Sequence, residues 1–162
     1  MPAILGRWAD AMAVLAGFVL FVIVAVTTTN VGAFILDRFL PGDVAGLPGY
    51  EDFVQLVIGG AALMFLPHCQ ARRGHVAVEL FVERLPRSFQ RVTDRLWLAL
   101  TAAIALFLAY WMLQGLFQAK NDTVITAVLG WPVWPFYIPG LLALLLWAAI
   151  ALGQIVGKDD HD

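Results

Sequence analysis

The residues that could carry chemistry lie mainly in one short segment in the middle of the chain. His75, Glu79 and Glu83 follow one another at intervals of four residues, so in a helix they form one stripe. Imidazole and carboxylate groups at this spacing can converge on a metal ion. The solvated face of an amphipathic helix has the same pattern, and no second group of ligands lies nearby in the sequence. We therefore interpret the stripe as a polar helix face, and expect neither a metal nor another cofactor.

Apolar side chains cover much of the rest of this segment. The pattern predicts an amphipathic helix over about residues 75–85, lying at a membrane interface and ended by Pro86. Arginines stand on both sides of it, at Arg72, Arg73, Arg87, Arg91 and Arg95. Their guanidinium groups could meet lipid phosphates, and we expect this contact above all at the last three.

Composition identifies what surrounds this segment. Of 162 residues, 61% are apolar and 14% are charged, whereas soluble domains are about 45–50% apolar and about 25% charged. This indicates an integral membrane protein. The formal net charge of -2 gives no reason to expect a nucleic-acid partner. The single Cys69 excludes a disulfide or a cysteine-pair redox site within one chain.

Four uncharged runs predict the architecture, because about 20 apolar residues suffice for a helix to cross a bilayer. We expect an all-α membrane fold with transmembrane helices over about residues 11–36, 49–68, 96–119 and 134–156, in one domain of residues 1–162. The first run is longer than the apolar core of a cleaved signal peptide. The second is the weakest, with Pro67 near its end. Residues 123–133 should form a loop or a re-entrant edge before the last span.

The distribution of positive charge predicts the orientation. With four spans, both termini and the middle segment share one side, which carries eight of the ten Lys and Arg residues. Only Arg38 and Lys120 lie on the other side. The positive-inside rule then places both termini in the cytoplasm.

The spans themselves contain little that could react. None holds Asp, Glu, Lys or Arg when the second is counted from its uncharged part, which begins at Phe53, although pumps and carriers usually need ionisable groups inside their spans. A membrane cytochrome would need axial ligands inside the bundle, and only His68 comes close. The polar residues favour hydrogen bonds between helices; they are Thr27, Thr28, Thr29, Asn30, Gln55, Thr101, Gln114, Gln118 and Gln154. Asn30, Gln114 and Gln118 could alternatively touch a substrate. We expect neither an enzyme nor a self-sufficient transporter.

The middle segment also resembles a family signature. Arg73-Gly74-His75-Val76-Ala77-Val78-Glu79-Leu80-Phe81, followed by Leu85-Pro86, is similar to the motif of DctQ-type proteins, the small membrane subunits of TRAP (tripartite ATP-independent periplasmic) transporters. Chain length, four spans, the Tyr50-Glu51 approach to span two and the Pro-rich entry to span four are similar as well. Glu79 replaces the more frequent Asp, and Tyr50 stands where Trp is frequent.

The resemblance implies a non-catalytic scaffold subunit of a sodium-driven transporter for carboxylate-type solutes in the bacterial inner membrane. A large, DctM-like membrane subunit would carry the substrate and ion sites, and a periplasmic solute-binding protein would deliver the solute. The family motif and interfacial helix would comprise Arg72, Arg73, Gly74, His75, Val78, Glu79, Glu83, Leu85 and Pro86. Arg38, Glu51, Lys120 and Asp122 lie on the external side, where they could contact the periplasmic protein or simply be solvated.

Two other classes of function remain open. One is a stand-alone small membrane carrier that oligomerises, which an essential charge inside a span would favour. The other is a membrane anchor of an electron-transfer complex, which bound haem would favour.

Overall fold

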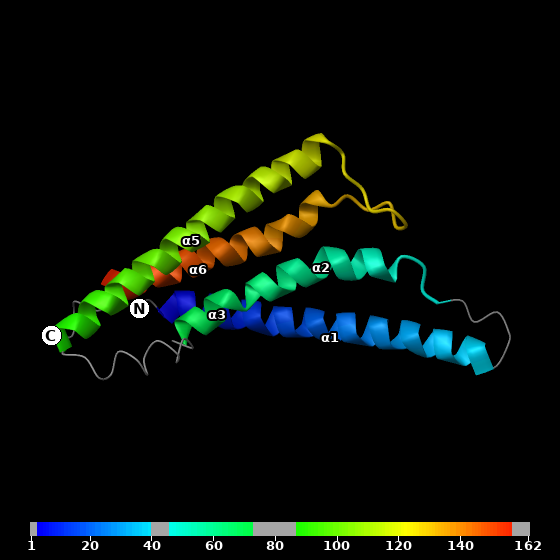
Figure 1. Ribbon diagram of the computed structural model, residues 1–162, viewed down its shortest axis with the longest axis horizontal. Coiled ribbons are helices and arrows are strands. Elements are labelled where there is room, and N and C mark those ends of the chain that lie inside the picture. The colour runs from blue at the N-terminus through cyan, green and yellow to red at the C-terminus, as the bar shows by residue number, and fades with distance from the viewer. Residues whose placement is uncertain (1–2, 40–45, 73–86, 157–162) are drawn as a thin grey trace.

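The fold is built from helices that are long enough to cross a membrane (Figure 1). The computed structural model describes residues 3–39, 46–72 and 87–156. Its elements are α1 (Ala3–Phe39), α2 (Tyr50–Met64), α3 (Leu66–Ala71), α5 (Arg87–Asn121), the 3-10 helix η1 (Trp134–Phe136) and α6 (Tyr137–Val156). Four stretches have the length and apolarity of a membrane span: Ile4–Phe39, Tyr50–Ala71, Val92–Asn121 and Trp134–Val156. The protein is therefore an all-α, multi-pass membrane protein.

Helix α1 is longer than the uncharged run, about residues 11–36, from which it was predicted. It begins at Ala3 rather than near residue 11, since Arg7 and Asp10 interrupt the hydropathy but are compatible with a helix. Its 37 residues correspond to about 55 Å, against about 30 Å for the hydrocarbon core of a bilayer. The helix must therefore tilt, or reach past the hydrocarbon at its ends.

Helix α5 also begins earlier than the predicted span, at Arg87 rather than near residue 96. The positions of Arg87, Arg91 and Arg95 consequently lie one turn apart on a single helix, not in a polar connection. The predicted interfacial helix over residues 75–85 lies outside the described residues.

The second candidate span is broken into two helices. Helix α2 ends at Met64, Phe65 forms a turn, and α3 continues from Leu66 to Ala71. Pro67 causes the break, because its nitrogen cannot donate to the carbonyl of Leu63 and its ring crowds the preceding turn. The expected single helix over residues 49–68 is thus a kinked pair.

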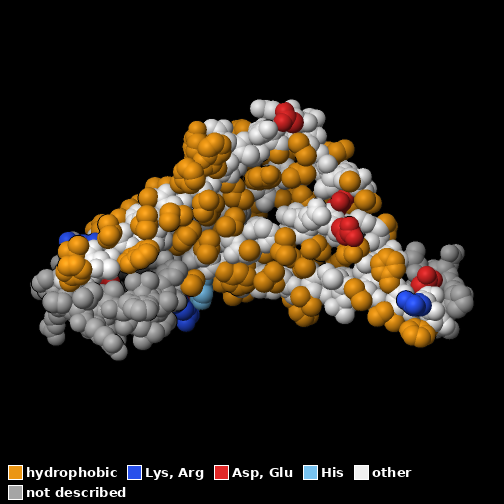
Figure 2. All heavy atoms as spheres, in the orientation of Figure 1, with side chains coloured by type: hydrophobic (Ala, Val, Ile, Leu, Met, Phe, Trp, Pro, Cys, Tyr) orange, Lys and Arg blue, Asp and Glu red, His pale blue; other side chains and the backbone are white. Residues whose placement is uncertain are grey.

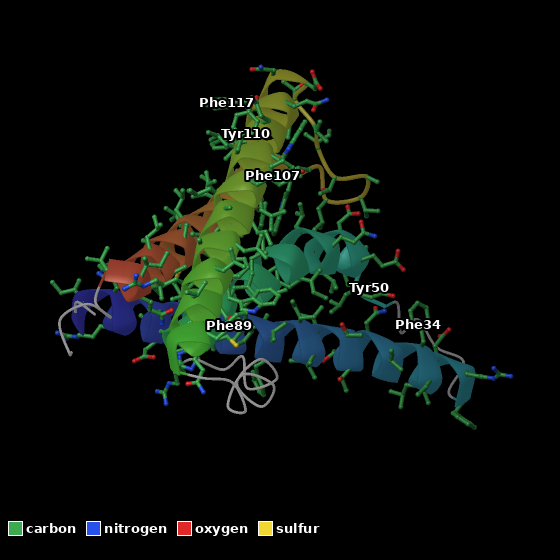
Figure 3. All side chains as sticks on the ribbon, turned by 60° about the vertical axis from the view of Figure 1, so that its left-hand side comes forward. Phe34, Tyr50, Phe89, Phe107, Tyr110 and Phe117 are labelled. Atoms are coloured by element: carbon green, nitrogen blue, oxygen red, sulfur yellow. The ribbon has the colours of Figure 1, made fainter. Side chains whose placement is uncertain are left out.

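The helices gather at one end and diverge at the other. α5 packs along α6, α6 packs on α2 and α3, and α1 packs on α2 and α3. The start of α1, all of α3, the start of α5 and the end of α6 lie together at the end marked N and C (Figure 1). We call this the inner end. At the opposite, outer end, α1 and α5 point away from each other in both ribbon views (Figures 1 and 3).

Small residues make the contacts between helices. Among the described residues, buried apolar positions are mostly alanines: Ala9, Ala16, Ala61, Ala102, Ala105, Ala109, Ala119, Ala143, Ala148 and Ala151. One buried cluster joins Ala16 of α1, Met64 of α2 and Ala143 of α6. Many larger apolar side chains are exposed instead, and hydrophobic side chains cover much of the face seen in Figure 2. This arrangement suits lipid, where close backbone approach rather than burial of large side chains drives helix association.

Candidate functional site

Polar side chains tie the helices together at the inner end. The Gln70 amide of α3 donates through Nε2 to Oε1 of Gln154 on α6 at 2.8 Å. Gln154 Nε2 donates back to the main-chain oxygen of Gln70 at 2.9 Å, and Trp147 Nε1 donates to Gln70 Oε1 at 3.4 Å. Gln70 is only 4% exposed. Because an unpaired amide in a membrane protein interior is costly, this reciprocal pair holds α3 against α6.

A second inner contact joins α1 to α3. Asp10 Oδ1 lies 2.9 Å from His68 Nδ1 and 3.9 Å from Arg72 Nη2. Both partners of the closer pair are substantially exposed, with side-chain accessibilities of 31% for His68 and 55% for Asp10. Exposed pairs of this kind contribute little to stability. Arg72, the first residue of the predicted arginine group, caps the C-terminal end of α3.

The remaining residues of the family motif lie outside the described structure. Arg73, Gly74, His75, Val78, Glu79, Glu83, Leu85 and Pro86 all lie between the end of α3 and the start of α5, in residues that the structure does not describe. Over 3–39, 46–72 and 87–156, no group of three or more His, Cys, Asp or Glu side chains could hold a metal ion.

The external residues singled out from the sequence sit at separate helix ends. Arg38 lies in the last turn of α1 and Lys120 in the last turn of α5, where cations stabilise the helix dipole. Glu51 lies in the first turn of α2 and accepts a hydrogen bond from the Tyr50 hydroxyl at 3.2 Å. Lys120 Nζ also lies 5.4 Å from the centre of the Trp134 ring. Asp122 directly follows α5.

Asp52, which the sequence did not single out, connects the outer loop to α2. Its Oδ2 accepts hydrogen bonds from the main-chain nitrogens of Val128 at 2.7 Å and Leu129 at 3.0 Å. Gly49 makes the approach feasible: its φ of +79° favours glycine, and an added Cβ would lie 2.7 Å from the Leu129 side chain. Residues more than 70 positions apart are joined here, and nothing in the sequence around Asp52 indicates this partner.

Asn30 forms the other outer contact, between α1 and the segment that leads into α2. Its Oδ1 accepts a hydrogen bond from the Leu47 nitrogen at 2.8 Å. The side chain is 1% exposed, and among the described residues its Nδ2 has no hydrogen-bond partner. Gly46 is needed for this contact, because an added Cβ would stand 2.7 Å from Asn30 Oδ1. Asn30 therefore connects two segments of one chain, as the expectation of interhelical packing anticipated in part.

The other polar span residues with an assigned hydrogen bond make contacts inside their own helix. Thr29 Oγ1 donates to the Ala25 oxygen at 2.8 Å, and Gln114 Nε2 donates to the Tyr110 hydroxyl at 3.0 Å. Tyr110 and its neighbours Phe107 and Phe117 project from the outer part of α5 (Figure 3). Each of these three rings is more than half exposed. The region is thus an apolar outer surface, not a polar binding pocket.

Together, the helices and their polar ties define a multi-pass membrane protein whose described residues form a packed bundle with a large apolar exterior. Comparison with known families adds its identity: residues 35–160 match the family described as tripartite ATP-independent periplasmic transporters, DctQ component. The chain belongs to this family and is the small membrane component of such a transporter. No curated protein and no solved structure matched the chain.

Proposed function

We propose that the chain is a non-catalytic scaffold subunit of a sodium-driven TRAP transporter for carboxylate-type solutes. It would reside in the bacterial inner membrane with both termini in the cytoplasm. A large, DctM-like membrane subunit would pack against it and carry the substrate and ion sites. A periplasmic solute-binding protein would deliver the solute to that assembly.

The outward-facing apolar side chains of α1 and α5 are the observation that carries this proposal. Exposed large residues run along both helices, among them Phe18, Phe21 and Phe34 on α1 and Phe107, Trp111 and Phe117 on α5. The uncharged runs of the chain offer no carboxylate or ammonium group at which an ion could be translocated. A body with much outer contact area and no ionisable centre suits packing against another membrane chain, and does not suit transport by itself.

The inner end supports a role at the cytoplasmic leaflet. Arg72 ends α3, and Arg87, Arg91 and Arg95 occupy successive turns at the start of α5. In this proposal the motif segment between them lies along the leaflet surface, with the arginines on phospholipid phosphates. The external positions Arg38, Glu51, Lys120 and Asp122 would offer contacts to the periplasmic protein.

A transport assay with purified components tests the proposal. The chain is reconstituted into proteoliposomes alone, or together with its co-purifying large subunit and the binding protein, under an imposed sodium gradient. Uptake of a labelled dicarboxylate, keto acid or sugar acid is measured in turn. We expect no uptake by the chain alone, and gradient-dependent uptake of one solute by the full set. Uptake by the chain alone would establish the small-carrier alternative instead, and a haem absorption band in the purified chain would indicate the electron-transfer anchor.

A further inference from the structure

The outer loop between α5 and η1 exposes apolar side chains where a soluble loop would carry polar ones. Val124, Ile125, Val128 and Trp131 are 42%, 62%, 64% and 45% exposed. No charged residue occurs from Thr123 to Gly157. The loop therefore continues the uncharged character of the following span, although it is not itself a helix.

Most main-chain amides of this loop are hydrogen-bonded, either within the loop or to α5 and Asp52. Main-chain nitrogens of Val124, Thr126 and Val133 donate to main-chain oxygens at 2.9–3.1 Å. The Trp131 nitrogen donates to Thr126 Oγ1 at 3.1 Å, and a β-bridge pairs Ile125 with Pro132. A loop in water does not need these hydrogen bonds, because water can bond to its free main-chain amides. In contact with lipid, an unsatisfied main-chain group has no such partner and is strongly disfavoured.

The tip of the loop is also held in a fixed position relative to the start of α2. Asp52 accepts the amides of Val128 and Leu129 at its tip, as described above. The loop reaches from the outer end of α5 toward the start of α2 (Figure 1). Its tip therefore lies at the end of a candidate span, where hydrocarbon gives way to headgroups.

Aromatic and basic side chains at the base of the loop suit the same boundary. Trp131 stacks on Phe136 with ring centres 6.5 Å apart, and Lys120 lies over Trp134. Trp at a helix end, with a Lys that can reach headgroups, is typical of the membrane–water interface.

From these observations, we propose that residues 123–133 form an interfacial anchor. The loop would insert Ile125, Val128 and Trp131 into the boundary between headgroups and acyl chains, in the leaflet opposite the termini. Lipid is favoured over a soluble protein as the occupant because the exposed face is uncharged and most of its main-chain amides already have partners within the protein, whereas a protein-docking rim is rich in polar groups. This proposal does not depend on the proposed transport function.

Site-directed spin labelling tests the anchor. In a Cys69→Ala background, which removes the one native thiol, nitroxide labels are placed through Ile125→Cys or Val128→Cys. Matched controls are Asp122→Cys at the base of the loop and Glu51→Cys at the start of α2, both exposed positions. The full chain is measured in nanodiscs of phosphatidylethanolamine and phosphatidylglycerol, with and without its co-purifying proteins. Collisions of the label with oxygen, which concentrates in lipid, and with a water-soluble nickel chelate report its surroundings.

We expect the labels at positions 125 and 128 to collide several-fold more with oxygen than with the nickel chelate, relative to both controls. Nickel accessibility equal to that of the controls would show a solvated loop and overturn the proposal. Shielding from both reagents only when the co-purifying proteins are present would identify a protein as the occupant and equally overturn it. Because all four positions are exposed, the substitutions disturb no packed contact, and an unchanged elution profile of each labelled variant verifies this.

Discussion

The inner and outer ends of the bundle are held together in different ways. At the inner end, side chains on different helices bond directly to each other, as Gln70 does with Gln154 and Asp10 with His68. At the outer end, α1 and α5 diverge (Figure 1), and helix side chains bond instead to the main chain of connecting segments. Asp52 holds Val128 and Leu129, and Asn30 holds Leu47.

This difference indicates where the stability of the fold resides. Direct helix–helix bonds and close alanine contacts make the inner end and the centre one cooperative unit. Loop contacts at the outer end position surface features without joining the diverging helices. Disruption at the inner end should therefore lower global stability, whereas disruption at the outer end should act locally.

The largest effect on stability is expected from a substitution in the buried contact between α1, α2 and α6. Ala143 is fully buried against Ala16 and Met64, so Ala143→Leu adds volume that only helix separation can accommodate. We expect a loss of about 1–3 kcal/mol in the free energy of unfolding, measured by titration from mild detergent into dodecyl sulfate. Leu145→Phe on an exposed position of the same helix is the control and should change little. Equal effects of both substitutions would show that this junction is not tightly packed.

Loss of the inner amide pair should have the next largest effect. Gln154→Leu removes the acceptor of Gln70 Nε2 and the donor to its main-chain oxygen, so we expect a loss of about 1–2 kcal/mol in the same titration. The double substitution Gln70→Leu with Gln154→Leu should cost less than the sum of the two single losses, because both single substitutions break the same Gln70–Gln154 side-chain hydrogen bond. Gln118→Leu, on an exposed position, is the control. Strict additivity in the double variant would argue against a coupled pair.

Loss of the hydrogen bonds between Asp52 and the outer loop should affect only the loop. Asp52→Ala frees the amides of Val128 and Leu129, and hydrogen exchange at these two positions should speed up several-fold. Asp52→Asn keeps an acceptor and should have a weaker effect, while Glu51→Gln should leave both amides unchanged. Faster exchange along the whole of α6 would contradict the distinction between the two ends.

The smallest effect is expected at the exposed inner pair. Asp10→Asn weakens the contact with His68 and Arg72 while keeping the side chain's shape. The free energy of unfolding should fall by less than about 1 kcal/mol, and high salt should reduce the difference further. A large, salt-independent loss would show that this pair is more important than its exposure indicates.

Hydropathy predicted the membrane character of the fold but not where its helices end. The run from Ala11 to Leu36 marks what lipid can surround, whereas α1 continues to Ala3 and Phe39 because no proline stops it. Proline was informative where it did occur. Pro135 coincides with the short η1 element that opens the last span, and Pro67 with the break between α2 and α3.

The sequence predicted that polar residues would form hydrogen bonds, but not which partners they would have. Of the polar span residues that were expected to bond between helices, Gln154 does so, whereas Thr29 and Gln114 bond within their own helices. Asn30 bonds to the main chain of Leu47 in a connecting segment. The partners of Gln154 and Asn30 were not foreseen, because Gln70 lies next to the charged end of its span and Leu47 contributes only its main chain. The Asp52 contact was missed altogether, since an acid in the first turn of a helix has an ordinary local explanation. Partners this distant in the sequence leave no local pattern.

The central claim, that the chain is a scaffold for a larger transport subunit, is tested most directly by identifying what it binds. The affinity-tagged chain is isolated from its native membrane in mild detergent, and the co-purifying proteins are identified by mass spectrometry. We predict one much larger polytopic membrane protein in near-equal amount. Recovery of the chain alone, or only with further copies of itself, would contradict the scaffold role.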